Sequence, residues 1–556
     1  MAQLQFKGKT FVQNHHLMVK YHELVPIKSK SLTDKVSLND NLIIHGDNLA
    51  ALKALLPLYA GKIKCVYIDP PYNTGNEKWV YNDSVNSPMM QEWLGKVVDR
   101  EDLTRHDKWL CMMMPRLKLL RELMTPDGAI FISIDDNESR RLLNLTDEVF
   151  GEQNFAAQVS ILVNPKGRVM SQGFAQTHEY LIIYRRTEAL KEFAIEKSEE
   201  EIKEQYPFED DKGTFRYLEL RNTHRQFGKH NRPNLFFPIY CNPNIHKVSI
   251  KPHPGYLRVL PIWDDGFEGC WTWSADKVGK EIKRLSCRAV GDNIRVYRKA
   301  YSTDELGSIV SKKPTSLWTE KDFYTEKGQA EVDEILGSQA FYAPKPSALI
   351  KNIIKISAGQ NSFVLDSFAG SGTTAHAVLA LNKEDGGNRK FILVECEDYA
   401  DSITAERVRR VIKGVPGAKD ESLRKRLGGT FSYFELGKPM ELEGILSGKN
   451  LPSYKELARY IFYTATGETF NEKSVDMKKG FIGESANHQV FLFYEPDIDK
   501  LKGMALTLEI AEKLPPIKWG KRRLIFAPTK YLDQEYLENY KIDFAQLPFE
   551  IYHRVR

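Results

Sequence analysis

The chain has 556 residues, with 79 Lys and Arg against 74 Asp and Glu and a net charge of +5. A chain of this length exceeds one hydrophobic core and should divide into about three or four units. The near balance of charge excludes a uniformly basic nucleic-acid-binding protein, so any basic surface must be local. Six scattered cysteines do not suit a secreted disulfide scaffold. We find no signal peptide and no run of about 18 apolar residues, and expect a cytoplasmic protein without membrane contact.

Residues 1–40 carry mixed charges without clear periodicity, and we predict an N-terminal arm. This arm either covers the rest of the protein or waits for a partner, and the sequence leaves both interpretations open. From residue 41 the strands NLIIHG, KCVYID and AIFISID alternate with the helices NLAALKALLPLYAG and WLCMMMPRLKLLRELM, with the turn TPDG before the third strand. This alternation predicts βαβ units and a parallel sheet. The strand HEYLIIYRR closes this first half, which we assign to residues 41–190.

The pattern changes after Thr187, where the charged, helical stretch EALKEFAIEKSEEEIKEQ leads into irregular, aromatic-rich sequence. The α/β alternation returns with ALIKNIIKIS, SFVLDSF, AHAVLALN and KFILVEC. We therefore predict one Rossmann-like α/β domain, made of residues 41–190 and 339–415 and interrupted by an insertion over 191–338. The strands QVFLFYE and RLIFAP and the helix GMALTLEIAEKL predict a small C-terminal α/β domain over 425–556, which we interpret as an interaction module.

The first chemical motif is CVYIDPPYNTGNE, in which Asp69, Pro70, Pro71 and Tyr72 follow an apolar strand. Prolines cannot donate to a sheet ladder, so these residues should form a stiff loop at the carboxyl end of the strand. Ligands of open α/β sheets bind at that edge. A purely structural turn is the alternative, but four specified residues together with a glycine loop favour a functional site.

The second motif is DSFAGSGTTAHA, with Asp366 ending a strand and Thr373 opening a helix. Gly370 and Gly372 in the turn between them would let a ligand approach the backbone at a helix N-terminus. Glu395 ends the next strand, where a carboxylate suits ribose hydroxyls. Phe368 fits the hydrophobic core and a cofactor contact equally well. No GxxxxGK[ST] pattern occurs, which argues against a P-loop, while the glycine turn alone leaves NAD possible.

DPPY and DSFAGSGTT together resemble the motifs of S-adenosylmethionine-dependent DNA amino-methyltransferases, which modify adenine N6 or cytosine N4. The catalytic motif precedes the cofactor motif, which matches the permuted β-group arrangement, and the resemblance covers roughly residues 40 to 415. FISIDDNES, GGTFSYFELG and LARYIFYTATGETF are similar to stretches in modification subunits of type III restriction systems.

The resemblance implies S-adenosylmethionine as cofactor, with Asp47 of IIHGDNLAAL near its adenine. Asp47 could instead cap the helix that begins near Leu49, a use that is compatible with the cofactor role. In FYAPKPSALI, Lys345 and Pro346 would line its methionine end. It further implies that Asp69 and Pro70 accept the hydrogens of the target amino group, while Tyr72 stacks on a base flipped out of double-stranded DNA.

An aspartate in the first position of the catalytic motif favours adenine. Cytosine N4 methylation is the alternative, and an inactive DNA-binding or assembly protein is the second alternative. The resemblance also leads us to expect a homodimer and a separate restriction subunit as partner, because no nuclease or helicase motif is present.

The insertion should read DNA. The stretch RYLELRNTHRQFGKHNR offers the candidate DNA contacts Arg221, Arg225, Lys229 and Arg232. A solvated basic face is the alternative interpretation for each. Four residues of the insertion suit zinc by type but lack any CxxC spacing, so we predict no metal site; they are Cys241, His246, Cys270 and Cys287.

Overall fold

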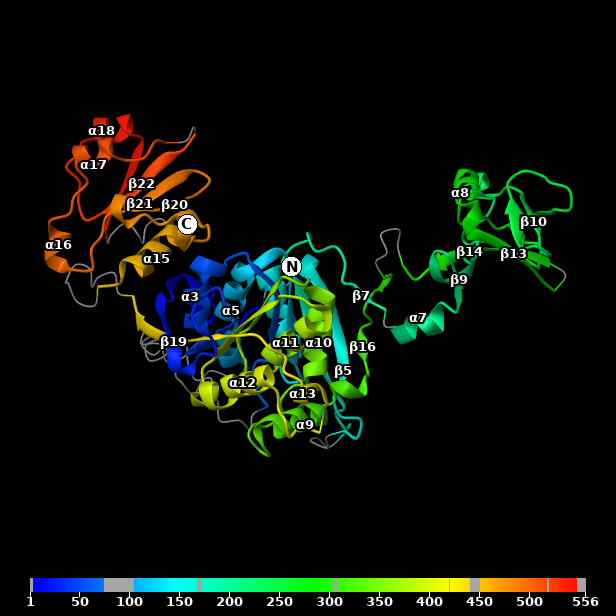
Figure 1. The fold of residues 1–556 in the computed structure, drawn as a ribbon, viewed down its shortest axis with the longest axis horizontal. Coiled ribbons are helices and arrows are strands. Elements are labelled where there is room, and N and C mark those ends of the chain that lie inside the picture. The colour runs from blue at the N-terminus through cyan, green and yellow to red at the C-terminus, as the bar shows by residue number, and fades with distance from the viewer. Residues whose placement is uncertain are drawn as a thin grey trace. The chain divides into compact units, whose positions relative to one another are not determined.

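The computed structural model describes residues 4–74, 105–167, 173–197, 199–291, 293–303, 309–419, 421–440, 451–517 and 520–547. The chain divides into two compact units. The larger comprises Met1–Phe193 with Thr315–Arg556, and the smaller comprises Ala194–Pro314 (Figure 1). The smaller unit begins close to the start predicted for the insertion but ends earlier, so helix α9 (Thr325–Leu336) belongs to the larger unit.

A ten-stranded sheet forms the centre of the larger unit. Its strands follow the spatial order β1 (His22–Pro26), β19 (Ser432–Pro439), β2 (Leu42–His45), β18 (Lys390–Glu395), β17 (Phe363–Asp366), β3 (Ile63–Ile68), β4 (Met124–Ile134), β6 (His178–Arg185), β5 (Phe155–Leu162) and β16 (Leu317–Trp318). The five strands from β2 to β4 are parallel. The predicted Rossmann-like α/β fold is confirmed.

The order of these strands brings the two chemical motifs together. β17, which ends at Asp366, is hydrogen-bonded to β3, which ends just before Asp69. Both strands run in the same direction, so the loops that follow them emerge at the same edge of the sheet. Residues from the two halves of the predicted domain therefore meet there.

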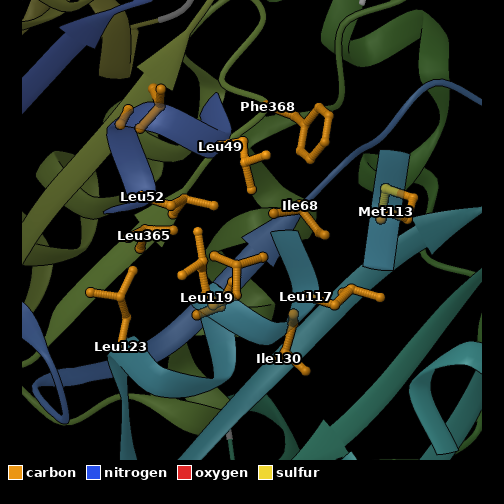
Figure 2. Packing of buried hydrophobic residues seen from close by; sticks show 14 of the residues in the cluster. Leu49, Leu52, Ile68, Met113, Leu117, Leu119, Leu123, Ile130, Leu365 and Phe368 are labelled. Carbon is orange, nitrogen blue, oxygen red and sulfur yellow. The ribbon is translucent and has the colours of Figure 1, made fainter. Parts of the chain in front are cut away.

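Helices cover both faces of the sheet. One group packs together on the first face: α3 (Asn48–Tyr59), α5 (Arg105–Leu123) and α6 (Ser139–Phe150). Figure 2 shows Leu117 of α5 near Ile68 and Ile130 in this core. The second group lies on the opposite face: α10 (Ser347–Ser357), α11 (Thr373–Asp385) and α12 (Glu406–Lys413). Both faces of β3 are consequently buried, as its nearly continuous apolar sequence predicts.

The described part of the N-terminal arm packs on the larger unit. It forms the short helices α1 (Lys9–Val12) and α2 (His15–Met18) and then β1, which pairs with β19 at one edge of the sheet. The Lys9 Nζ lies 2.8 Å from Glu148 Oε2. The sequence left open whether this arm covers the rest of the protein or orders only with a partner. In the structure the described part of the arm covers the rest of the larger unit.

The C-terminal domain predicted over 425–556 starts later than predicted, because β19 belongs to the central sheet. The region that follows begins with α15 (Tyr454–Thr466), which packs against α3. Its four-stranded sheet has the order β20 (Phe481–Glu484), β21 (His488–Leu492), β22 (Arg522–Ala527) and β23 (Ile542–Gln546). Its short helices are α16 (Ile498–Lys502), α17 (Leu508–Glu512) and α18 (Gln534–Asn539); another, α13 (Glu421–Arg424), precedes this region. The stretch predicted as one helix over 503–514 contains only the single short helix α17.

The smaller unit is built mainly from antiparallel strands. A four-stranded sheet has the order β13 (Leu285–Val290), β14 (Asn293–Tyr301), β9 (Gly213–Glu219) and β8 (Phe208–Asp210), and a three-stranded sheet has the order β11 (Lys247–Ser249), β10 (Ile239–Asn242) and β12 (Leu257–Val259). A third pair joins β7 (Ile195–Glu196) to β15 (Ser311–Lys312). The helices are α7 (Glu199–Gln205) and α8 (Ala275–Lys280). The stretch predicted as helical after Thr187 is thus a helix only over α7. No helix in the described parts of the chain is long and apolar enough to span a membrane.

Candidate active site at the carboxyl edge of the sheet

Asp69 follows β3 directly, and its carboxylate is paired with Lys345 from the second half of the domain. The Lys345 Nζ donates to both carboxylate oxygens, at 2.8 Å to Oδ1 and 2.7 Å to Oδ2. Burial raises the pKa of Asp69, and the ammonium offsets part of this rise. Burial alone would lower the pKa of Lys345, but the charges of Asp69 and Glu179 outweigh it and raise this pKa. The charge of the Lys345 ammonium thus favours the ionised form of the Asp69 carboxyl, against the effect of burial.

Tyr72 extends this cluster to Glu179, which lies at the start of β6. The Tyr72 hydroxyl donates to Glu179 Oε2 at 2.9 Å and accepts from Lys345 Nζ at 2.9 Å. The same Nζ lies 4.9 Å from the centroid of the Tyr72 ring and 3.5 Å from Glu179 Oε2. Because β6 is antiparallel to β4, its first residues lie at the same edge as the carboxyl ends of the parallel strands.

Helix α5 fixes the loop that carries the catalytic motif. The Trp109 Nε1 donates to the Pro71 carbonyl at 2.7 Å. Asn73, whose φ is +56°, donates from Nδ2 to the Arg105 carbonyl at 3.3 Å and also to the buried carboxylate of Glu138. Two fixed proline φ angles and these side-chain contacts leave the loop little freedom.

The glycine turn between β17 and α11 has the left-handed backbone that the motif predicts. Gly370 has φ +51° and Gly372 has φ +80°, and Gly372 caps α11. A Cβ on Gly372 would lie 3.0 Å from the Thr404 carbonyl oxygen. Asp366 holds the residues on both sides of the turn. Its carboxyl oxygens accept from the Phe368 amide at 3.0 Å and from the Thr374 hydroxyl at 2.5 Å. Burial raises the pKa of Asp366 to about 7.

Glu395 fastens the same turn to the neighbouring strand. Its side chain accepts from the backbone amides of Gly370 at 2.7 Å, Cys396 at 2.9 Å and Glu397 at 3.1 Å. The residue is 1% exposed, and burial raises its pKa to about 7 against the effect of these hydrogen bonds. Three of its roughly four acceptor positions are thus filled by backbone amides. The ribose contact inferred from the sequence stays a prediction.

Asp47 caps α3 and faces a buried arginine. Its Oδ1 accepts from the Ala50 amide at 2.9 Å, and its Oδ2 lies 3.1 Å from Arg116 Nη2. The Arg116 side chain has no exposure and also donates to Asn48, whose Nδ2 donates to the Ser367 carbonyl at 3.0 Å. Arg116 therefore positions the acid predicted near the cofactor and links it to the glycine turn.

The other predicted cofactor residues are Phe368, Thr373, Lys345 and Pro346, all from the second half of the domain. Phe368 is 4% exposed and lies in the apolar core near Leu49 (Figure 2). The Thr373 hydroxyl donates to the Lys345 carbonyl at 3.2 Å, and Pro346 caps α10. The backbone of Lys345 thus contacts the first residue of the helix after the glycine turn. Its ammonium contacts Asp69 of the catalytic motif, which the sequence did not predict.

The four cations predicted to contact DNA differ in their surroundings. Arg221 is 8% exposed, pairs with Glu219 at 2.9 Å and lies 4.4 Å from the centroid of the Trp263 ring, so it supports the smaller unit from inside. Arg225 and Lys229 are exposed but face acidic partners, Asp265 at 2.6 Å and Glu268 at 2.8 Å respectively.

Arg232 is exposed, and its guanidinium carbon lies 4.0 Å from the centroid of the Phe227 ring. Of the four predicted contacts, the structure thus removes Arg221 from the surface that is available to a nucleic acid. The other three remain exposed.

The insertion cysteines are buried thiols. The Cys287 Sγ donates to the Lys247 carbonyl at 3.2 Å, and His246 Nδ1 lies 3.0 Å from the Cys287 carbonyl oxygen. Within the described ranges, no group of three or more His, Cys, Asp or Glu is arranged to hold a metal ion.

Several residues of the site are absent from the sequence motifs. Glu179 is an acid at the start of a largely apolar strand, and Arg116 directly follows the apolar run WLCMMMP of α5; a charge beside such a run is the available signal. Arg407 has no exposure either, and its Nη1 donates to the hydroxyls of Ser371 and Thr373 at 2.8 Å. Trp109 gives no comparable signal, because an aromatic residue in a helix normally reports only the core.

Several known proteins are similar to this chain in sequence. The chain is 34% identical over 420 residues to the type III restriction-modification enzyme EcoPI Mod subunit of Escherichia phage P1, covering 69% of this chain and 64% of that subunit. It is 35% identical over 370 residues to the type II methyltransferase M.KpnI of Klebsiella pneumoniae, covering 66% of this chain and 82% of that protein. The chain thus spans less than two thirds of the EcoPI subunit.

A solved structure of the M1.HpyAVI complex with SAM matches with a TM-score of 0.31 at 14% identity, over 66% of this chain and 98% of that one. The model of the family N6_N4_Mtase, described as DNA methylase, matches residues 63–406. The resemblance inferred from the motifs is confirmed, and because this match covers more than half of its residues, the chain belongs to this family of DNA methylases.

Proposed function

We propose that this protein transfers a methyl group from S-adenosylmethionine to adenine N6 in double-stranded DNA. The observation that carries the proposal is the meeting of Asp69 and the Gly370 turn at one edge of a parallel sheet, with Lys345 contacting both. An acidic, aromatic loop beside a glycine turn at a helix N-terminus suits a nucleoside cofactor and a second, planar substrate.

The proposed cofactor contacts fit the chemistry of the residues present. The side chain of Asp47 is 31% exposed, which leaves part of its carboxylate accessible to a polar group. Gly370 and Gly372 keep the backbone of the turn clear of side chains, and Glu395 and Asp366 hold that backbone in place. S-adenosylmethionine would supply an activated methyl group on its sulfonium sulfur.

The chain's own residues would prepare the target nitrogen. An exocyclic amino group is a weak nucleophile, because its lone pair is delocalised into the ring. When the Asp69 carboxylate and the Pro70 carbonyl each accept one amino hydrogen, they favour a pyramidal nitrogen with an available lone pair. This is electrostatic preorganisation for the transition state, and it needs no covalent intermediate. Tyr72 would hold the flipped base by stacking.

The assembly around this activity is part of the same proposal. The relatives named as Mod subunits of type III systems support a role as the modification subunit of such a system, with a restriction subunit as partner. We place DNA recognition in the smaller unit and expect a homodimer. The C-terminal region, which has its own apolar clusters, would serve as the interaction module.

The proposal is tested by incubating the protein with unmethylated bacterial DNA and S-adenosylmethionine that carries a labelled methyl group, then digesting the DNA to nucleosides. Label in N6-methyladenine supports the proposal. Label in N4-methylcytosine keeps the mechanism but changes the base, in line with a family that is named for both positions. The absence of both labelled nucleoside and cofactor binding would favour the inactive assembly protein.

A further inference from the structure

The Lys345 ammonium contacts the same groups that the target base must contact. It donates to both oxygens of Asp69 at 2.8 and 2.7 Å, where the proposed mechanism places an amino hydrogen. It also lies 4.9 Å from the centre of the Tyr72 ring, on which the base would stack. The two oxygens of Asp69 offer roughly four acceptor positions, so the ammonium and the target amino group compete for the space beside Asp69 and Tyr72 rather than for a single lone pair.

The ammonium must therefore move when the base enters, and a buried charge that moves needs another acceptor. The side chain of Lys345 is 14% exposed, and that of Glu179 is 15% exposed. Leaving an ammonium unpaired at such depth is costly. The Glu179 Oε2 lies 3.5 Å from Nζ, just beyond hydrogen-bond length, so a small rotation of the lysine side chain would complete the bond.

We propose that Glu179 is a positioning residue for methyl transfer: it accepts the Lys345 ammonium when the target amino group replaces that ammonium on Asp69. This inference rests on the proposed function. Glu179 also holds the Tyr72 hydroxyl at 2.9 Å, so the ring keeps its place while the lysine moves. The net charge of the cluster does not change in the exchange, because no proton is transferred.

Glu179→Gln tests the exchange, because it keeps the size of the side chain and removes its charge. We expect the KM for DNA to rise about tenfold, as for the loss of one coupling between neighbouring charged groups, with little change in kcat and in S-adenosylmethionine affinity. Glu179→Asp should recover part of the loss. Glu188→Gln, at an exposed glutamate shortly after the same strand, is the matched control for one lost negative charge.

A double-variant cycle separates the exchange from simple support of Tyr72. In a Lys345→Met background there is no ammonium to relocate, so Glu179→Gln should change the KM for DNA by less than about twofold. An equal effect of Glu179→Gln in both backgrounds, or no effect in the wild-type background, overturns the inference and leaves the proposed function standing. A wild-type protein that binds the cofactor but methylates no DNA overturns the proposed function, and the inference falls with it.

Discussion

Lys345 Nζ and the carboxylate of Asp69 are in hydrogen-bond contact although 276 positions separate the two residues in the chain. This contact joins the catalytic half of the domain to the cofactor half across the whole insertion. It depends on strand order, because β17 is inserted beside β3 from a distant part of the sequence. The candidate site therefore exists only when both halves of the domain are folded together.

Asp69→Asn should reduce the methylation rate by about 100- to 1000-fold, as for the loss of one preorganised electrostatic contact in other active sites. The amide keeps the shape of the side chain but offers a poorer acceptor to the amino group. Rate measurements with saturating cofactor and DNA check this expectation. Asp136→Asn is a suitable control, since Asp136 is an exposed acid after the adjacent strand β4. Full activity of Asp69→Asn would rule out the proposed role.

Gly372→Ala should weaken S-adenosylmethionine binding and lower the melting temperature. The new Cβ would lie 3.0 Å from the Thr404 carbonyl oxygen, and the residue would keep a φ of +80°. Gly386→Ala is a matched control at the other end of α11, because Gly386 has φ +70° but no atom within 4 Å of the added Cβ. It should show only the backbone cost, about 1–3 kcal/mol. Calorimetric titration measures the S-adenosylmethionine affinity of both variants, and thermal melts measure their melting temperatures. Equal affinities and equal melting temperatures would show that the turn is not crowded.

Glu395 should make the folded protein less stable as the pH rises towards neutrality. Burial raises the pKa of this carboxyl from its usual 4.5 to about 7, so the folded state holds the proton more tightly than the unfolded chain. Its contribution to stability is complete below pH 4.5 and is lost as the pH rises through about 7.

Relative to Glu395→Gln, the wild-type protein should lose stability over this range, with a slope of at most about 1.4 kcal/mol per pH unit. Denaturant unfolding of both proteins measures the difference, and Glu188→Gln controls for the lost charge. A difference that is independent of pH would refute the assignment.

Arg221→Ala should act mainly on protein stability, whereas Arg232→Ala should act mainly on DNA binding. Arg221 is buried and paired with Glu219, so its removal should lower the melting temperature of the protein. Arg232 is exposed and loses only its contact with Phe227, so its removal should lower the melting temperature much less than that of Arg221. If it contacts a phosphate, the slope of log K against log salt should fall by about 0.9. DNA-binding isotherms at several salt concentrations decide this, and an unchanged slope would remove Arg232 from the DNA surface.

The positions of the catalytic and glycine motifs could be predicted from the sequence, because each depends on local chemistry. Prolines after a strand and glycines before a helix constrain their own backbone, whatever lies around them. The turn predicted at TPDG illustrates the same point. Between the pairs Ile63–Met124 and Cys65–Ala129, β3 advances two residues and β4 five, so the tetrapeptide bulges out of the ladder even though it lies within β4.

The partners of these motifs could not be predicted, because they are set by strand direction and order. Glu179 reaches the site since β6 runs antiparallel to β4, which no local pattern indicates. Arg221 and Arg232 belong to one basic stretch, yet only the fold of the smaller unit decides that the first is buried. The helix predicted over 503–514 is confined to α17 because Leu506 and Lys530 form a bridge between the chain segments on either side of β22.

The most direct test of the central claim is the transfer of a labelled methyl group from S-adenosylmethionine to unmethylated DNA by the wild-type protein, read by nucleoside analysis. We predict label in N6-methyladenine, and its loss in Asp69→Asn. Saturable binding of S-adenosylmethionine and of DNA without any labelled nucleoside would contradict the claim that Asp69 and the Gly370 turn form a working methyltransferase site.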